Sequence, residues 1–471
     1  MRGAARNGFQ LIALSTALAV QCSRSRLALA LAGFALLSAG ATAQDKEADA
    51  ALERLKQSLQ SEPNLSEDTK AAMADFFDAL SERHAELDAV DMEALQRLAA
   101  SAPVAPGRWE KLKERLTVHG DLRLREEVSF KLDDQENRER MRYRLRLGAD
   151  YRLDDEFTVG ARIRTGDRMD PNSPHSTLGD GFRTDEVSLD RAFIAYRPEG
   201  EPGLRVIGGK FQHPFYANPI YGELVWDADV APEGIAATYT LPGDESGERL
   251  DFALGLYTAV EQGGGPEARV LVAQVAGHER LGEQTTGSLA LGYYQYSRIT
   301  PDGGQLLVGE NPSQTAGGNQ LIDTDGDTVM DDYASGFKIW NPIASVTHTG
   351  WCEPVTFSAE YIRNADATGS RDSGYALGVA VGQQREPGDW QYYYQWQKVE
   401  QEAVFAAFAQ DDFLLAANQV GHVFGTRYRI TDQVGAHLWA LISARDSAGT
   451  TATTDSRSDQ WRVRFDIDVR F

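Results

Sequence analysis

One short stretch carries an arginine at every second position: Arg140, Arg142, Arg144 and Arg146. Apolar residues fill the positions between them. Because alternate side chains of a β-strand point to opposite faces, the arginines would form one row and the apolar residues the other. Guanidinium groups stay charged and present several donors, so such a row can hold carboxylates, phosphates or other anions. The stretch therefore predicts a strand with an anion-attracting face and an apolar face.

The same period of two recurs from Leu116 to the end of the chain. Sixteen segments of roughly ten residues follow it, starting near residues 116, 138, 156, 187, 203, 233, 249, 269, 286, 335, 354, 372, 389, 418, 432 and 459. Ten tilted residues are enough to cross a bilayer. In the last segment, Trp461 to Phe471, ten steps of about 3.3 Å rise on the order of 23 Å at about 45° tilt, which places these two aromatic residues near the membrane interfaces.

The connections between the segments alternate between short turns and longer loops, up to the stretch 298–334. Outer-membrane barrels have this asymmetry, with turns in the periplasm and loops outside the cell. The sequence therefore predicts an all-β transmembrane antiparallel β-barrel of about sixteen strands. A barrel of that size encloses a water-filled lumen, whereas eight strands are filled by side chains.

The N-terminal region differs from the rest. Residues 1–43 combine a basic start, an apolar run and a small-residue site ending at Ala43, which predicts a signal peptide. Residues 44–101 lack glycine and carry apolar residues at helical spacing, which predicts a periplasmic helical or coiled-coil segment; a partly disordered acidic spacer is the alternative. Residues 102–115 then read as a linker to the barrel domain, 116–471.

Composition excludes several classes of protein. Removing the signal peptide leaves 43 basic and 70 acidic residues, a net charge of −27, which argues against a nucleic-acid partner. Only Cys352 would remain, so no internal disulfide can form. No catalytic motif and no histidine spacing typical of a metal enzyme is found, so we expect no enzyme activity.

We expect the polar face of each strand to line the lumen, with a continuous basic sector across the first, second, third and last strands. Its members are Arg123, Arg125, Arg140, Arg142, Arg144, Arg146, Arg162, Arg164, Arg462 and Arg464. The third long loop, 213–233, carries the constriction candidates Glu223, Asp227 and Asp229. If this loop folds inward, its carboxylates would face the arginines across water and tune ion selectivity. Alternatively, the arginines pair with acids on adjacent strands and line a wall without selectivity.

A second acidic loop has a pattern of its own, with carboxylates around Gly326: Asp323, Asp325, Asp327 and Asp331. Such alternating oxygen ligands are typical of calcium loops, although the order departs from the EF-hand. The loop is therefore either a calcium site or a solvated acidic loop.

Several motifs together resemble a family of Gram-negative bacterial proteins known as putative porins: HGDLRLREE (119–127), RYRLRLGADYRLDDEFTVGARIRTGD (142–167), TLGDGF (177–182), GGKFQHPF (208–215) and LVWDADVAPEGIAATY (224–239). The resemblance covers about residues 116–471. It implies a β-barrel pore in the cell outer membrane with a periplasmic helical extension, as a homotrimer.

The function predicted is passive diffusion of ions and small hydrophilic solutes, with anion preference as the direct consequence of the basic sector. One alternative is a channel specific for phosphate or another oxyanion. Another is a structural protein in which the barrel anchors helices that contact peptidoglycan. No cofactor beyond the possible Ca²⁺ is expected.

Overall fold

The computed structural model describes residues 112–130, 136–243, 248–261, 267–299, 317–324, 326, 330, 332–413, 415–447 and 459–471. The predicted signal peptide and helical segment lie outside the described residues. Among the described residues, no helix is long and apolar enough to cross a membrane.

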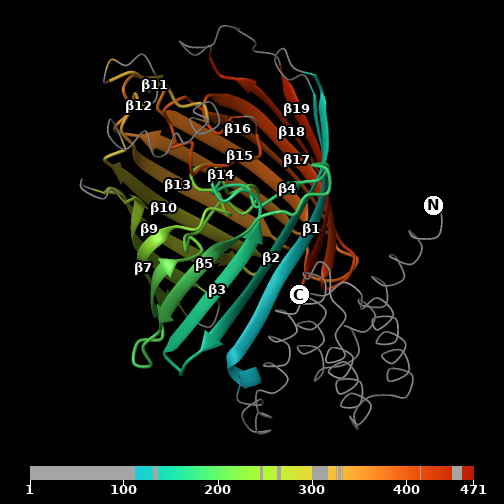
Figure 1. Cartoon of the computed structure of the whole chain (residues 1–471). Coiled ribbons are helices and arrows are strands. Elements are labelled where there is room, and N and C mark those ends of the chain that lie inside the picture. Colours follow the sequence, from blue (N-terminus) through green and yellow to red (C-terminus); the bar gives the residue numbers. More distant parts are fainter. Residues whose placement is uncertain are drawn as a thin grey trace, which may run out of the picture. The chain divides into compact units, whose positions relative to one another are not determined.

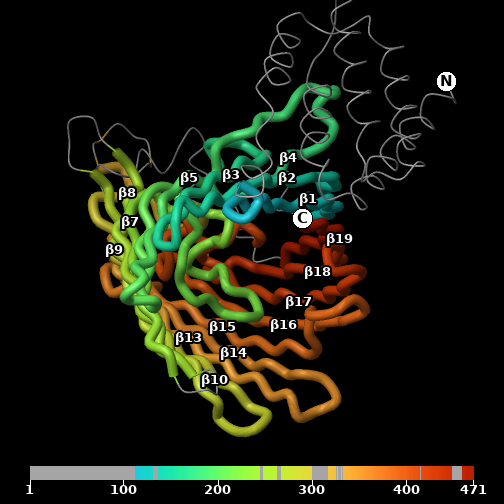
Figure 2. The backbone as a smooth tube through the Cα atoms, turned by 90° about the horizontal axis from the view of Figure 1, so that it is seen from below, coloured from blue at the N-terminus to red at the C-terminus, as the bar shows by residue number. Residues whose placement is uncertain are grey.

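In the described part of the chain, sixteen long strands form one antiparallel sheet that closes on itself, as Figures 1 and 2 show. They are β1 (Leu116–Phe130), β2 (Arg138–Arg152), β3 (Phe157–Thr165), β5 (Val187–Tyr196), β6 (Leu204–Lys210), β7 (Glu233–Pro242), β8 (Arg249–Val260), β9 (Ala268–Gly282), β10 (Thr285–Ser297), β13 (Lys338–His348), β14 (Val355–Asn364), β15 (Ser373–Gly382), β16 (Trp390–Val399), β17 (Gln419–Arg429), β18 (Val434–Arg445) and β19 (Gln460–Arg470). Two-residue strands lie in the loops: β4 (Ser176–Thr177), β11 (Leu321–Ile322) and β12 (Asp332–Tyr333).

The predicted closed barrel and its strand count are confirmed, and each strand begins within three residues of its predicted start. Closure joins the first strand to the last: the backbone N–H of Gly120 donates to the carbonyl of Phe471 at 2.8 Å, and that of Phe471 donates back at 3.1 Å. Closure leaves no unpaired sheet edge, as a barrel in lipid requires.

The outer face of the barrel is apolar. The side chains of Leu124, Met141 and Phe465 are exposed by 52%, 56% and 46%, and each alternates with an inward charged residue. In the same outward set are large residues of other strands, including Leu254, Leu377 and Tyr392. A soluble protein rarely exposes so much apolar surface, whereas a barrel in lipid needs it.

One end of the barrel carries seven short turns and both ends of the sheet; we call it the turn end. The other, the loop end, carries the long connections. Three of these matter for the site: L2 (166–186), L3 (211–232) and L7 (400–418). All three contribute buried residues, and residues of L3 and L7 belong to the main apolar cluster of the described part of the chain.

Candidate functional site: an arginine wall covered by loop carboxylates

Strand register sets the chemistry of the inner wall. β1 lies between β2 and β19, and its inward residues are opposed by charged residues on both sides. Arg123 is opposite Asp468, and Arg125 is opposite Asp466. Asp121 is opposite Arg146 on β2. Because directly opposed side chains of antiparallel strands are close neighbours, the register itself forms cross-strand ion pairs.

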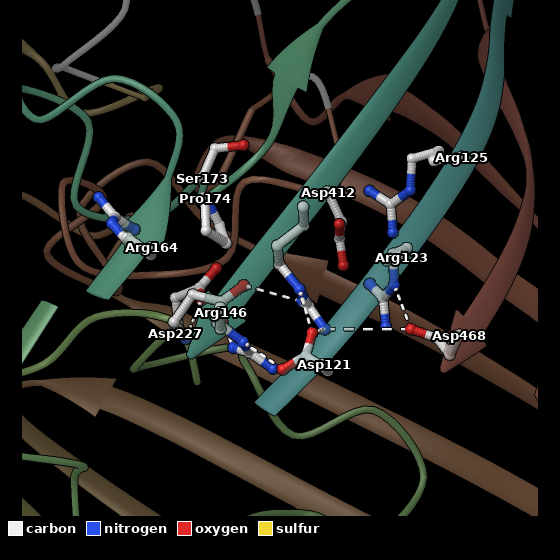
Figure 3. Close-up of polar contacts among 12 residues, drawn as sticks. Asp121, Arg123, Arg125, Arg146, Arg164, Ser173, Pro174, Asp227, Asp412 and Asp468 are labelled. Atoms are coloured by element: carbon white, nitrogen blue, oxygen red, sulfur yellow. Dashed lines mark hydrogen bonds and ion pairs between the residues drawn. The ribbon is translucent and has the colours of Figure 1, made fainter. Parts of the chain in front are cut away.

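The ion pairs nearest the turn end involve Asp121, which lies between two arginines (Figure 3). Its carboxylate is 2.7 Å from Arg144 Nη2 and 2.6 Å from Arg146 Nε. Arg146 also contacts Asp229 of L3, with Nη1 at 2.6 Å from Oδ1. Asp229 Oδ2 is 3.7 Å from Arg144. Two arginines of the wall are therefore shared between one strand carboxylate and one loop carboxylate.

The middle of the wall is formed by β1 and β19. Arg123 Nε donates to Asp468 at 2.7 Å, and Arg125 makes two bonds to Asp466, of 2.7 and 2.9 Å. Trp439 Nε1 donates to the same Asp466 carboxylate at 3.1 Å. Paired acceptors and donors of this kind are the strong form of an ion pair. These arginines are neutralised within the sheet.

The third set of pairs, towards the loop end, surrounds Glu127, which is 1% exposed. Its carboxylate accepts from Arg464 Nε at 2.5 Å and from Arg140 Nε at 2.6 Å. Arg464 also contacts Asp412 of L7. Here one strand arginine, Arg464, is shared between a strand carboxylate and a loop carboxylate, whereas Arg140 contacts the strand carboxylate alone.

The remaining arginines of the predicted sector hold the loops. Arg142 donates to Ser173 Oγ and to the His175 carbonyl of L2, at 3.0 and 3.2 Å. Arg464's neighbour Arg462 donates to backbone carbonyls of L7. Arg164 donates to three carbonyls of L2. Within the described residues, Arg142 and Arg462 form no ion pair, and their buried Nε atoms have no partner.

Arg162 pairs with Asp190 of β5, a residue that the strand pattern did not single out. A β-bulge explains this: the pairing runs from Arg162↔Arg191 to Ile163↔Leu189, so Asp190 is the extra residue. Bulges redirect side chains and interrupt strict alternation. Asp190 is 3% exposed and also lies 3.8 Å from Arg164 Nε.

L3 reaches across the inside of the barrel. The Tyr216 N–H donates to Gln274 of β9 at 2.8 Å, and Asn218 Nδ2 lies 3.2 Å from Glu360 of β14 and 3.3 Å from Gln395 of β16. At its other end, Asp229 contacts β2. L3 therefore contacts opposite sides of the wall, a path that can be followed in the tube of Figure 2.

The three predicted constriction residues have different environments. Asp229 contacts the arginine wall directly, so no water layer separates this carboxylate from it. Asp227 is buried, and its Oδ1 accepts the Asp229 N–H at 2.7 Å. The Glu223 carbonyl accepts the Gln410 N–H of L7 at 3.0 Å. Of the three, only Asp229 forms an ion pair among the described residues.

L7 is the element that the sequence did not predict at the site. The Asp227 N–H of L3 donates to the Phe408 carbonyl at 2.8 Å, and Tyr221 Oη donates to Asp412 at 3.1 Å. Trp226 and Phe408 pack with ring centroids 5.4 Å apart. L2 joins through Asn172, whose Nδ2 donates to the Ala409 carbonyl at 2.6 Å. The three loops thus form one packed unit, the loop block, on the inner face of the barrel.

The loop block excludes solvent from part of the arginine wall. The side chains of Arg125, Glu127, Arg464 and Asp466 are at most 3% exposed, whereas those of Asp121, Arg123, Arg146, Asp229 and Asp468 are 14–21% exposed. Arg140, at the loop end, is again 18% exposed. The predicted water-filled lumen therefore does not extend evenly along the arginine wall: its middle is covered, and both ends reach solvent.

The loop carboxylates differ in protonation. Burial raises the pKa of Glu223 and of Asp227 well above the usual range; repulsion from Asp412 adds to the effect on Glu223, and repulsion from Glu223 adds to the effect on Asp227. Burial and the neighbouring Asp412 raise the pKa of Asp411 to about 7. For Asp229, burial acts in the same direction, but Arg144 and Arg146 outweigh it and lower the pKa. Asp229 is therefore the charged member of L3, as its contact requires.

The proposed calcium loop falls mostly outside the described residues, which include Asp323 but not Asp325, Asp327 or Asp331. Asp323 Oδ1 accepts the Gly326 N–H at 2.6 Å, a turn contact that leaves the calcium prediction untested.

The sequence model of a family described as "Putative porin" matches residues 126–331, which confirms the resemblance over that stretch. No curated protein matches the chain. Among solved structures, the high-pH form of Pseudomonas putida OprB has a TM-score of 0.51 at 12% identity, covering 78% of this chain and 96% of that chain. An anion-selective porin from Comamonas acidovorans has a TM-score of 0.45 at 11% identity, covering 76% and 99%. At such identities the OprB likeness concerns the fold alone.

Proposed function

From the closed sixteen-strand barrel and the family match over residues 126–331, we propose that this chain is an outer-membrane channel for ions and small hydrophilic solutes. The observation that carries the proposal is the division of each strand into an apolar outer row and a charged inner row. A pore through lipid needs both faces at once. Passage is passive and requires no reaction.

The balance of charge on the strands supports an anion preference. Eight of the ten arginines of the predicted sector pair with only five strand carboxylates: Asp121, Glu127, Asp190, Asp466 and Asp468. The loops supply two more, Asp229 and Asp412. Since pore walls with an excess of one sign select the opposite ion, the wall favours anions even with the loop block in place.

The test is conductance of the purified full-length protein in planar bilayers. In a KCl gradient, the reversal potential should show chloride preferred over potassium. A preference for potassium would refute the proposed anion preference but not the proposed channel function. Absence of any conductance from correctly folded barrels, identified by their heat-sensitive mobility in SDS gels, would refute the channel itself.

The oxyanion-specific alternative has one observation in its favour, the two buried arginines without a carboxylate partner, Arg142 and Arg462. Conductance in phosphate that saturates at low concentration would support it. The alternative of an envelope anchor is tested by deleting residues 45–107: loss of envelope integrity with unchanged conductance would make anchoring the main role.

Three further parts of the proposal concern the setting of the channel. Residues 1–43 direct export, the segment 44–101 lies in the periplasm, and three copies assemble. Cross-linking of intact cells and calcium titration by calorimetry test the trimer and the Asp323–Asp331 loop, respectively.

A further inference from the structure

The two loop carboxylates on the arginine wall occupy similar positions in two separate sets of charges. At the turn end, Arg144 and Arg146 share Asp121 and Asp229. Towards the loop end, Arg140 and Arg464 share Glu127, and Arg464 also contacts Asp412. In each set, two arginines share an acid that is fixed on a strand, and a loop supplies a second acid, which contacts both arginines at the turn end and Arg464 alone towards the loop end.

The strand acids cannot leave, because they are part of the barrel ladder. The loop acids are different. L3 and L7 are joined to each other by backbone hydrogen bonds, Asp227 N to Phe408 O and Gln410 N to Glu223 O, at 2.8 and 3.0 Å. The two loops therefore present Asp229 and Asp412 to the wall as parts of one unit.

We propose that Asp229 and Asp412 occupy the positions of a permeating solute's carboxylate, so that small carboxylate anions pass by displacing them from the arginine wall. This inference rests on the proposed channel function and specifies its solute class. Each displacement exchanges one carboxylate for another at arginines that keep their strand partner. Each arginine therefore always keeps a negatively charged partner. Breaking a buried ion pair is costly because it leaves a buried charge without such a partner, and this exchange avoids that cost.

The exposure of the wall supports such a route. The Asp229 set is partly open to solvent. In the Glu127 set, Arg140 and Asp412 are partly exposed and Glu127 and Arg464 are dry, and Arg125 and Asp466 between the two sets are buried. An anion entering at the turn end meets Arg123 and Arg146 first. Arg142 and Arg462 have buried Nε atoms without hydrogen-bond partners, so these N–H groups can donate hydrogen bonds to the anion in transit.

The experiment uses the full-length protein in planar bilayers in KCl, with sodium acetate added as the probe. The variants are Asp229→Asn, Asp412→Asn and the double variant. Asp432→Asn is the matched control, because its carboxylate is 81% exposed and lies in the turn between β17 and β18, at the turn end of the barrel, whereas L3 and L7 belong to the loop end. Asp229→Glu, which keeps the carboxylate, tests whether a change of side chain alone has an effect.

We expect the double variant to raise the chloride-over-potassium permeability ratio by roughly fivefold, which is the equivalent of about 1 kcal/mol. Acetate should block chloride current in the wild type, and in the double variant at roughly fivefold lower concentration, since no protein carboxylate competes. Asp229→Glu and Asp432→Asn should behave as the wild type.

The inference is overturned if the double variant conducts with the selectivity and acetate block of Asp432→Asn, in a wild type that does conduct. If the folded wild type does not conduct, the proposed channel function fails, and the inference with it.

Discussion

Glu127→Gln should destabilise the barrel more than any other single change of one carboxylate to an amide on β1. The Glu127 carboxylate contacts Arg464 Nε at 2.5 Å and Arg140 Nη2 at 2.5 Å. Glu127 and Arg464 are both 1% exposed in their side chains, and Arg140 is 18% exposed. Two positive charges therefore lose their shared counter-ion, and one of them has no access to water.

The magnitude follows from two opposing effects. Each arginine–carboxylate contact near 4 Å is about 4 kcal/mol at an effective dielectric constant of 20. Removing the buried carboxylate also removes its own desolvation cost, which is several kcal/mol. Arg464 keeps Asp412, and the amide oxygen of glutamine keeps one acceptor. We expect a net loss of about 3 kcal/mol in the free energy of unfolding, at the lower end for broken buried ion pairs.

The assay is equilibrium unfolding in urea of the protein refolded into detergent or lipid vesicles, followed by tryptophan fluorescence. Glu126→Gln is the matched control, because it makes the same substitution one residue earlier on the outward, exposed face of β1. A difference between the two variants below about 1 kcal/mol would contradict the buried ion-pair reasoning, since that is the range of exposed pairs.

Three other predictions concern closure, pH and packing. Gly120→Ala should impair closure of the barrel and lower the yield of folded protein, because the new Cβ would lie 2.5 Å from the Arg146 carbonyl oxygen and 2.7 Å from the Phe471 ring; Gly200→Ala, with open space around it, should fold normally. The contact between L3 and L7 should weaken as the pH rises from about 4 to about 7: docked Asp411 has its pKa raised to about 7, so the docked state binds more protons and is favoured at low pH. Open probability in bilayers should therefore rise over that range and vary less with pH in Asp411→Asn; an unchanged pH profile in that variant would contradict the assignment. Phe405→Ala should loosen L7 by about 3–5 kcal/mol of local packing, since the Phe405 ring is fully buried against Tyr296 and Phe337. Faster proteolytic cleavage within 400–418 would show this loosening, and cleavage at the wild-type rate would count against it.

The sequence alone determined the barrel and the composition of its two faces. Strands that pair with neighbours on both sides and contact lipid on one face must keep a period of two for about ten residues. That constraint is local, so the alternation can be recognised without knowledge of the fold, for example in Met141, Arg142, Tyr143 and Arg144. Closure could be inferred as well, because neither edge of such a sheet can remain unpaired in lipid.

Only the tertiary structure decided which carboxylates cover the arginines. Asp190 reaches Arg162 through a bulge, and a bulge changes no residue type that a period of two would detect. Asp412 reaches Arg464 from a loop 52 residues away along the chain, through packing of L7 on L3 that no periodicity specifies. Loops have no repeating constraint on their side chains, so their positions follow from contacts that exist only in the folded chain. The arginine wall and a facing L3 carboxylate could therefore be predicted from the sequence, whereas the direct contact of Asp229 with the arginines and the contribution of Asp412 could not.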